Sequence, residues 1–274
     1  MVARFILTLT RPVRMLAAIS VSAIVFGPSR MGVPFVYRRS SPCISGQPPR
    51  VAILRVPQVS CRSTEVPNRN ACYHVGCDDI CMSKIFGTFG DPAKGEMGTE
   101  EETYGVITTA GLKTIIERLD VDANDVFTDI GSGIGNVVVQ FCCNTPVKFA
   151  RGIEFNTARH LRSVENLERL EALERLEPEK QISLEHGDMR HIDYSDSTIV
   201  FTSSIAFGAE LMSSLTRSCE MNDHLKYLIS LKPIGEATSL RFLGEIRNVG
   251  SSWGFGEGEA YSVYSNMPGV QMRS

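Results

Sequence analysis

The segment from Val126 to Glu154 constrains the fold of this chain more than any other. It reads VFTDIGSGIGNVVVQFCCNTPVKFARGIE, which predicts an apolar strand ending at Asp129, a glycine turn, an apolar helix and a second strand ending at Glu154. Only a residue without a Cβ readily adopts the dihedral angles of such a turn and lets a ligand approach the main chain, as at Gly131, Gly133 and Gly135. An acidic residue roughly 20 positions further on can accept hydrogen bonds from ribose hydroxyls. The segment predicts a nucleotide-type pocket at the carboxyl ends of two neighbouring parallel strands.

The acidic residue before the first glycine indicates the kind of nucleotide ligand. A dinucleotide site has glycines spaced G-x-G-x-x-G around a pyrophosphate, whereas this turn reads D-x-G-x-G-x-G-N. The Asp129 carboxylate would repel a pyrophosphate, but it suits a ligand that carries an ammonium or sulfonium charge. The pattern therefore favours S-adenosylmethionine over NAD as the cofactor. The alternative is a glycine-rich turn that binds no ligand.

Charge divides the chain into two parts. Residues 1–64 contain nine Arg and no Lys, Asp or Glu, so residues 65–274 hold 19 of the 28 basic and all 31 acidic residues. An acidic body has no general attraction to nucleic acid, which makes a basic partner the more natural substrate. Direct binding to nucleic acid is expected to be weak or to use the basic amino-terminal segment. At 274 residues and 43% hydrophobic, the chain can bury one substantial core.

The first 64 residues are predicted to lie outside that core. Their apolar run Met15–Gly27 is too short for a comfortable membrane span, and no integral membrane segment is expected. Three interpretations stay open: an organellar or secretory targeting segment, a start codon upstream of the true one, and a disordered basic arm. Residues 65–102 read as a linker and approach loop, and residues 103–274 as the catalytic domain.

Eight cysteines are too few for a dense disulfide framework. Cys142 and Cys143 lie in the helix after the glycine turn and are expected to be buried thiols. Four soft ligands also fall within ten residues, but their spacing matches no common zinc pattern: Cys72, His74, Cys77 and Cys81. Reduced cysteines without metal are the expectation, and a structural zinc is the alternative.

Beyond residue 103, short apolar runs alternate with longer amphipathic ones, as in an α/β fold with a mostly parallel sheet and helices on both faces. Helices are predicted at Thr109–Leu119 and at Thr157–Leu176, where leucines 161, 167, 170, 173 and 176 are expected to form a core-facing stripe. The predicted strands are Val126–Asp129, Phe149–Glu154, Gln181–Glu185, Thr198–Thr202 and Tyr227–Leu231, with an antiparallel pair at Phe242–Asn248 and Tyr261–Ser265.

Two further strand ends carry candidate site residues. Asp188 follows the third strand and could accept a hydrogen bond from an adenine amino group, while Met189 could cover a face of the ring. After the fourth strand, Ser203, Ser204 and Phe207 stand where a methyltransferase admits its acceptor. The alternatives are an ordinary Gly-Asp turn, a serine helix cap and a core phenylalanine.

Several motifs carry a resemblance to a known family. They occur in order over residues 103–265: TYGVIT, DIGSGIGN, GIE, GD, IAFGAEL, LISLKP, and SSW followed by AYSVY. Together they resemble the non-SET histone H3 lysine methyltransferases of the disruptor-of-telomeric-silencing family. The resemblance implies the Rossmann-like class I fold of S-adenosylmethionine-dependent methyltransferases. It also implies a nuclear enzyme acting on a histone H3 lysine in the nucleosome core.

The resemblance also assigns roles to residues. Tyr104 and Thr108 would belong to a loop over the cofactor. The methionine part would border Asp129, Gly131 and Asn136, the ribose Glu154, and the adenine Asp188 with Met189. Aromatic side chains would line a narrow lysine channel beside Ser204: Phe207, Trp253 and Tyr261, with Tyr264 as the alternative to Tyr261.

The chain departs from the family pattern at three positions. Val106 replaces an acidic residue, and Ser203 and Ser204 replace two asparagines, which leaves more room and fewer donors beside the methyl group. The alternatives are a methyltransferase for another protein, RNA or small molecule, which could be mitochondrial given the Arg-rich amino terminus, and a cofactor-binding pseudoenzyme. The number of methyl groups transferred, the recruiting partners and the oligomeric state are left open.

Overall fold

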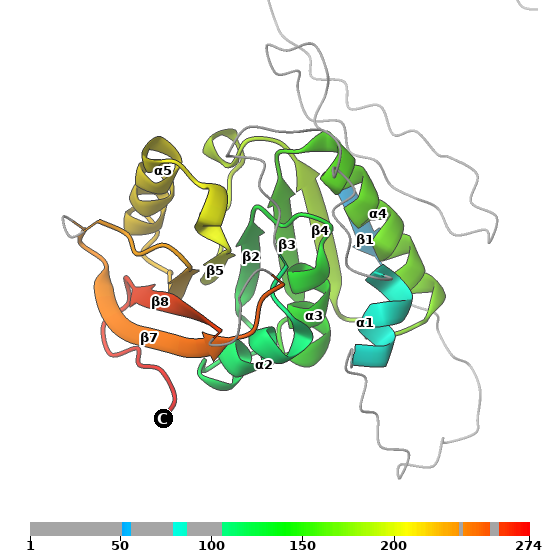
Figure 1. Cartoon of the computed structure of the whole chain (residues 1–274), viewed down its shortest axis with the longest axis horizontal. Coiled ribbons are helices and arrows are strands. Elements are labelled where there is room, and N and C mark those ends of the chain that lie inside the picture. Colours follow the sequence, from blue (N-terminus) through cyan, green and yellow to red (C-terminus); the bar gives the residue numbers. More distant parts are fainter. Residues whose placement is uncertain (1–50, 56–78, 87–105, 236–237, 253–257) are drawn as a thin grey trace, which may run out of the picture.

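A computed structural model describes residues 51–55, 79–86, 106–235, 238–252 and 258–274. Within these residues the fold is built on one sheet with the strand order β1-β4-β3-β2-β5-β6-β8-β7 (Figure 1). Its strands are β1 (Val51–Arg55), β2 (Val126–Ile130), β3 (Phe149–Glu154), β4 (Gln181–His186), β5 (Ile199–Thr202), β6 (Tyr227–Ser230), β7 (Arg241–Val249) and β8 (Glu259–Ser265).

The strand order places a ligand crevice at the middle of the sheet. β2, β3 and β4 step outward in one direction, and β5 and β6 continue on the other side of β2, all of them parallel. The direction of winding therefore reverses between β2 and β5. In an open α/β sheet, ligands bind outside the carboxyl ends of the strands at such a point. The predicted α/β class, with its parallel strands and closing antiparallel pair, is confirmed.

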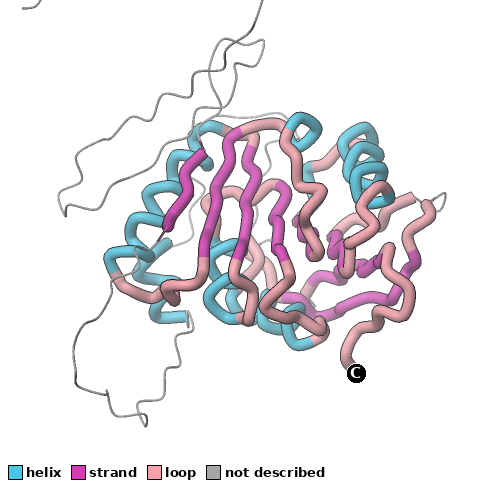
Figure 2. Tube along the Cα trace, turned by 180° about the vertical axis from the view of Figure 1, so that it is seen from behind, coloured by secondary structure: helices cyan, strands magenta, loops and turns pink. Residues whose placement is uncertain are grey.

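Helices cover both faces of the sheet. Successive side chains of a strand point to opposite faces, so the buried residues of the strands divide between two hydrophobic cores, one on each face. Phe127, Phe201 and Ile229 face the core shared with four helices, and Val200 and Leu228 face the core beneath α5. In Figure 2, seen from behind, the strands lie in front of the larger helical layer. The helices are α1 (Asp79–Phe86), α2 (Thr109–Glu117), α3 (Asn136–Asn144), α4 (Thr157–Ala172) and α5 (Ala209–Glu220). Among the described residues, no helix is long and apolar enough to cross a membrane.

In the described part of the chain, two elements precede residue 103, where the catalytic domain was predicted to begin. Strand β1, from the predicted amino-terminal segment, pairs antiparallel with β4 at the sheet edge. Helix α1, in the predicted linker, buries Cys81, Met82, Ile85 and Phe86 to 3% exposure or less. Arg169 of α4 also donates to the Ile85 carbonyl at 2.9 Å. The linker prediction was wrong for α1, because eight residues are too few to show a helical repeat and their burial is supplied by α4.

The predicted cysteine features can be placed only in part. Cys142 and Cys143 are buried in α3, as predicted. Cys72, His74 and Cys77 lie outside the described residues, and Cys81 faces the core from α1. Across the described ranges, no cluster of His, Cys, Asp and Glu is suited to a metal ion.

The predicted leucine stripe of α4 is only partly correct. Leu167, Leu170 and Leu176 are buried, whereas Leu161 is 42% and Leu173 37% exposed. The first turns of α4 bury smaller polar side chains instead, because they pack closely on the glycine turn. Ser163 lies where a Cβ on Gly135 would come within 3.3 Å, and Asn166 Nδ2 donates to the Ile134 carbonyl at 3.1 Å.

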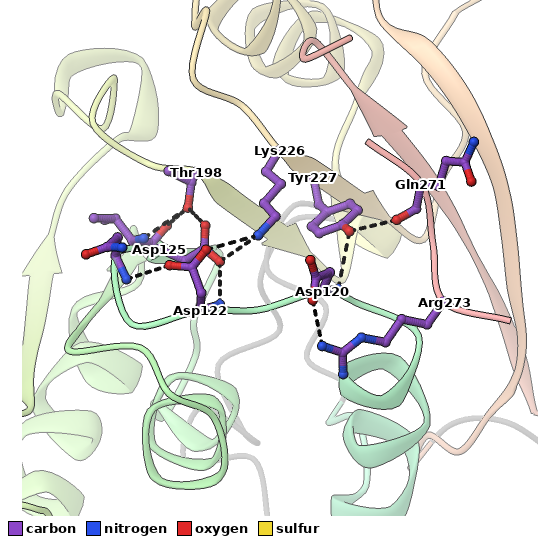
Figure 3. A network of polar contacts seen from close by, with 10 residues as sticks. Asp120, Asp122, Asp125, Thr198, Lys226, Tyr227, Gln271 and Arg273 are labelled. Carbon is purple, nitrogen blue, oxygen red and sulfur yellow. Dashed lines mark hydrogen bonds and ion pairs between the residues drawn. The ribbon is translucent and has the colours of Figure 1, made fainter. Parts of the chain in front are cut away.

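A polar network joins the amino ends of β2, β5 and β6, at the edge of the sheet opposite the crevice (Figure 3). The buried Asp125 carboxylate accepts hydrogen bonds from Thr198 Oγ1 at 2.8 Å and Lys226 Nζ at 3.1 Å. Beside it, Tyr227 Oη donates to the Gln271 carbonyl at 2.9 Å. The network therefore fastens the last residues of the chain under the sheet.

Replacing Lys226 with Met is expected to lower the free energy of unfolding by about 1–3 kcal/mol, because the buried Asp125 carboxylate loses its ammonium partner. Cofactor affinity should not change, since the network lies at the opposite edge. Urea denaturation measures the first effect, and Lys148→Met is the matched control because Lys148 is exposed. Equal stability of the two variants would contradict a stabilising ion pair between Lys226 and Asp125.

Candidate active site

A cavity lies at the carboxyl ends of β4, β3, β2 and β5, where the strand order predicts a crevice. Each strand end contributes one part of its wall. In order across the sheet, these parts are Asp188 and Met189 after β4, Glu154 at the end of β3, Asp129 and the glycine turn after β2, and Ser203 to Phe207 after β5. A ligand in this cavity can extend across four strands.

The glycine turn has the backbone conformation that its sequence predicts. Gly131, Gly133 and Gly135 have φ values of 79°, 55° and 84°, in the left-handed region that side chains strongly disfavour. The amides of Gly131 and Ser132 both donate to the Ile153 carbonyl, at 2.9 and 3.0 Å, which ties the turn to β3. Because Gly131 and Gly133 have no side chains, the turn leaves the cavity open above β2.

Asp129 is a buried carboxylate without a partner in the described part of the protein. It lines the cavity at 2% exposure, and no hydrogen bond or ion pair reaches it from the described residues. Burial raises the pKa of Asp129 well above its ordinary value, and the nearby Glu154 raises that pKa further. A buried charge of this kind is costly unless a cation pairs with it. The position therefore suits a cationic group on a ligand.

Glu154 is held by main-chain amides. Its Oε2 accepts from Gly133 N and its Oε1 from Asn156 N, both at 2.7 Å. Burial raises the pKa of Glu154, although these hydrogen bonds and Arg159 act in the opposite direction. Each carboxylate oxygen keeps a second acceptor site, which can receive hydrogen bonds from ligand hydroxyls.

The end of the cavity beyond β4 contains an ion pair. Asp188 accepts from Arg190 Nε at 3.0 Å and from Arg190 Nη2 at 2.6 Å, and Arg190 also contacts Glu210 of α5 at 2.9 Å. These hydrogen bonds to Arg190 are the main reason that the pKa of Asp188 is lowered, so the carboxylate is charged at neutral pH. Met189 is buried beside it, and Phe155 is 67% exposed at the cavity rim.

The segment after β5 presents one hydroxyl to the cavity and turns the next one away. Ser203 lines the cavity, together with Ile205, Ala206 and Phe207. Ser204 is fully buried outside it, where its Oγ lies 3.0 Å from Ser230 Oγ and accepts from Lys232 N at 2.9 Å.

Two segments far apart in the sequence are joined beside the cavity. Thr108 N donates to the Gly250 carbonyl, and Val106 and Ser252 exchange hydrogen bonds through Val106 N to Ser252 Oγ and Ser252 N to Val106 O. A Cβ on Gly111 would lie 2.3 Å from the Gly250 carbonyl oxygen, so glycine is required at position 111 for this approach. The contact joins residues 106–108 of the TYGVIT motif to residues 250–252, which include the two serines of the SSW motif.

A family comparison decides the relationship of the chain. Residues 96–242, more than half of its length, match the family model described as histone methylation protein DOT1. The chain belongs to the DOT1 family. The resemblance predicted from the motifs is therefore confirmed. The matched region ends at residue 242, so all but the first two residues of the β7–β8 hairpin, and the SSW motif, lie beyond it.

Two curated relatives support the membership. One is the Caenorhabditis elegans protein named "Histone-lysine N-methyltransferase, H3 lysine-79 specific", to which the chain is 28% identical over 149 residues. That match covers 49% of this chain and 15% of the relative. The chain is 27% identical over 113 residues to the Drosophila melanogaster protein of the same name, covering 39% of this chain and 6% of the relative. The matched segment is thus a small part of these relatives.

Among solved structures, an RNA methyltransferase from Salinibacter ruber in complex with S-adenosylhomocysteine is similar at a TM-score of 0.43 and 17% identity. The match covers 60% of this chain and 95% of that one.

The structure brings together most of the predicted cofactor residues of this DOT1 protein. Eight predicted site residues line one cavity: Asp129, Gly131, Gly133, Asn136, Glu154, Asp188, Met189 and Phe207. Tyr104 and Trp253 lie outside the described residues. Val106, the first departure from the family pattern, lies in the contact with Ser252.

Three predicted residues do not line the cavity. Thr108 caps α2, accepting from Gly111 N at 3.0 Å and donating to the Gly250 carbonyl at 3.1 Å. Ser204 points away because the chain forms a tight turn at Ser204–Ala206. Tyr261 is fully buried behind the wall, stacked on Phe201 at 5.4 Å between ring centroids. Their placement corrects the predicted direct contacts, although all three support the wall.

Sequence reasoning missed several lining residues. Arg159 enters from the first turn of α4, and Arg190 follows the adenine-side motif directly. Ile107, Ser132 and Leu211 lie inside motifs quoted above, and Val137 and Phe155 each follow a motif directly, so attention to whole motifs and their next residues would have found them. Phe201 lies in a predicted strand, and no local signal marks it as a lining residue.

Replacing Asp188 with Ala is expected to weaken cofactor binding by about 1.5–3 kcal/mol, the value of a hydrogen bond to a charged group. Glu210→Ala is the matched control, because it removes the other carboxylate partner of Arg190 outside the cavity wall. Isothermal titration calorimetry with S-adenosylmethionine should show less than about a threefold change for the control, since exposed ion pairs contribute little. Equal losses in both variants would show that Arg190, rather than Asp188, makes the contact.

Proposed function

We propose that this protein is a histone H3 lysine N-methyltransferase that uses S-adenosylmethionine and acts on a lysine in the nucleosome core. One observation carries the proposal: the buried Asp129 carboxylate, which has no partner among the described residues, lies between a ribose-type acceptor, Glu154, and the hydroxyl and apolar wall after β5. Family membership and the names of the worm and fly relatives support the histone substrate.

The residues of the cavity fit S-adenosylmethionine. Asp129 would offset a positive charge of the methionine part, Glu154 would accept ribose hydroxyls, and Asp188 would accept from the adenine amino group. When bound, the cofactor supplies a methyl carbon whose bond to a positively charged sulfur breaks with the electron pair left on sulfur. Gly131 and Gly133 leave space for this group beside the wall that follows β5.

The wall after β5 favours the reactive form of a lysine. A free lysine has a pKa of about 10.4, so its neutral amine is rare near pH 7. The apolar side chains of Ile205, Ala206 and Phe207 disfavour the charged ammonium and lower that pKa. An aromatic face such as that of Phe207 also attracts the methylated cation that forms. The amine then forms one bond to carbon and loses one proton to solvent, so alignment and desolvation suffice without a dedicated base.

The proposal extends to location and partners. A histone substrate places the protein in the nucleus, with the nucleosome as its partner, and the acidic residues 65–274 suit a basic histone. The nine arginines of residues 1–64 would supply contacts to DNA. Microscopy of a carboxyl-terminally tagged protein tests the location, and a mitochondrial signal would contradict it.

A transfer assay tests the activity. The full chain is incubated with S-adenosylmethionine labelled in the methyl group and, separately, with nucleosomes, free histones and RNA. Label on histone H3, located on a lysine by mass spectrometry, is the expected result. Transfer to RNA alone would refute the proposal, and cofactor binding without transfer to any acceptor would indicate a pseudoenzyme.

A further inference from the structure

A hydroxyl pair joins the cavity wall to the core behind it. Ser203 Oγ, on the wall, lies 2.9 Å from Tyr261 Oη, which belongs to β8 and is fully buried. Either oxygen can be the donor in this hydrogen bond. Ser203 thus has one side bound to the protein and one side toward the ligand space.

The Tyr261 hydroxyl has no other hydrogen-bonding partner within the described residues. Its ring is held by stacking on Phe201, so the hydroxyl position is set by the core. Burial raises the pKa of Tyr261, with smaller contributions from Asp129 and Glu259, so the phenol stays protonated at neutral pH. The group is therefore a neutral hydroxyl in a rigid place.

Ser203 is placed at the acceptor end of the cavity. The cofactor-type contacts run from β4 through β3 to β2, and β5 is the next strand in that direction. Phe201 of β5 pairs with Asp129 of β2 in the sheet, and Ser203 follows two residues later. Neighbouring polar groups are already engaged, since Ser204 bonds inward and Lys232 Nζ donates to the Phe207 carbonyl at 2.9 Å. Ser203 is the hydroxyl that the β5 segment offers to an incoming group.

We propose that Ser203 Oγ accepts a hydrogen bond from the substrate amine and orients it for methylation, and that Tyr261 is the positioning residue that holds the Ser203 hydroxyl. The inference rests on the proposed lysine methyltransferase function. It assigns the substrate contact of this segment to Ser203, whereas the motifs had suggested Ser204 as the catalytic serine.

The direction of the hydrogen bond within the pair explains how Tyr261 positions Ser203. The Tyr261 phenol is protonated and its hydroxyl has no other acceptor among the described residues, so it donates to Ser203 Oγ. This hydrogen bond fixes the Ser203 oxygen and leaves its second lone pair free to accept from a ligand. A neutral amine must keep its own lone pair free for the methyl group, so the Ser203 oxygen can hold it by an N–H group.

The test compares two variants of equal shape. Ser203→Thr keeps the hydroxyl, and Ser203→Val replaces it with a methyl group of similar size. We expect the threonine variant to keep kcat within about threefold of the wild type, and the valine variant to lose about tenfold, the upper part of the range for one neutral hydrogen bond. Calorimetry should give both variants the same Kd for S-adenosylmethionine within about twofold.

Tyr261→Phe tests the positioning role. It keeps the stacked ring and removes only the oxygen, so kcat should fall about threefold to tenfold, the effect expected from the loss of one neutral hydrogen bond, while the cofactor Kd stays the same. Thermal unfolding verifies that each variant is folded. If the threonine variant does not fold, Ser203→Ala against the wild type makes the same comparison without added bulk.

The outcomes separate the inference from the proposed function. Equal kcat for the threonine and valine variants, or for Ser203→Ala and the wild type, would overturn the inference while the enzyme remains active. A weaker cofactor Kd in the valine variant alone would also overturn it, by placing Ser203 against the cofactor. A wild-type protein that binds the cofactor but transfers nothing would instead overturn the proposed function.

Discussion

The Asp129→Asn variant is expected to bind S-adenosylmethionine about 10- to 100-fold more weakly than the wild type, the loss of a charged hydrogen-bonding partner. Without ligand, the same variant should be more stable than the wild type at neutral pH. Both effects follow from a buried carboxylate that lacks a partner in the described part of the protein. The charge is costly to the folded protein alone and useful once a cation pairs with it.

The pH dependence of the Asp129 effect has a defined sign. The pKa of Asp129 is raised in the folded protein above its ordinary value of 3.8. The stability associated with this group is fully present below about pH 4, and it is lost as the pH rises through the raised pKa. The stability advantage of the asparagine variant should therefore grow with pH over that window.

Cofactor binding should change in the opposite direction. A cationic ligand favours the ionised carboxylate, so the affinity of the wild type should increase as the pH rises through the same window, with release of a proton. The variant should lack the part of this dependence that belongs to Asp129. Calorimetry and thermal unfolding across pH measure both effects, with Asp223→Asn as the matched control at an exposed position. Equal affinity of the Asp129 variant and the wild type would exclude Asp129 from the cofactor site.

The Gly131→Arg variant is expected to lose measurable cofactor binding and transfer altogether. Gly131 lines the cavity with φ 79°, and a Cβ there would already lie 3.4 Å from the Phe207 ring. The longer side chain would fill the ligand space, and its guanidinium would compete with the ligand for Asp129. The left-handed backbone adds about 1–2 kcal/mol of strain to this effect.

Gly269→Arg is a matched control for that strain. Gly269 has φ 81°, and an added Cβ would meet nothing within 4 Å. The control should therefore lose similar stability and retain full cofactor affinity in calorimetry. If Gly131→Arg still binds the cofactor with the affinity of the control, the cavity is not the cofactor site.

Local sequence was sufficient for the parallel strands and for the acidic residues at their ends. Each of the five predicted parallel strands is present within about two residues of its expected bounds. The prediction that three acidic residues share one site has a physical basis, since the carboxyl ends of adjacent parallel strands lie at the same edge of the sheet. These residues are Asp129, Glu154 and Asp188. Because β4, β3 and β2 are neighbours in this sheet, the three carboxylates lie at one crevice.

Local sequence was insufficient where the chain is irregular. Ser203 and Ser204 are adjacent, and only the tight turn at Ser204–Ala206 decides that the first faces the cavity. The same holds for α4, where Leu161 was predicted to be buried but is exposed, because the glycine turn packs against Ser163 instead. The hydrophobic periodicity of a helix does not indicate which element each face of that helix packs against.

The sequence by itself determined the order of strands and helices, the glycine turn and the charge of the groups around it, because these depend on dihedral preference and on hydrophobic patterns within short segments. The tertiary structure alone decided that α1 joins the core, that residues 106–108 pair with residues 250–252, and that Tyr261 supports Ser203. Such contacts join residues up to 146 positions apart, as between Val106 and Ser252. Their geometry depends on how the whole sheet and its helices pack, which no local pattern encodes.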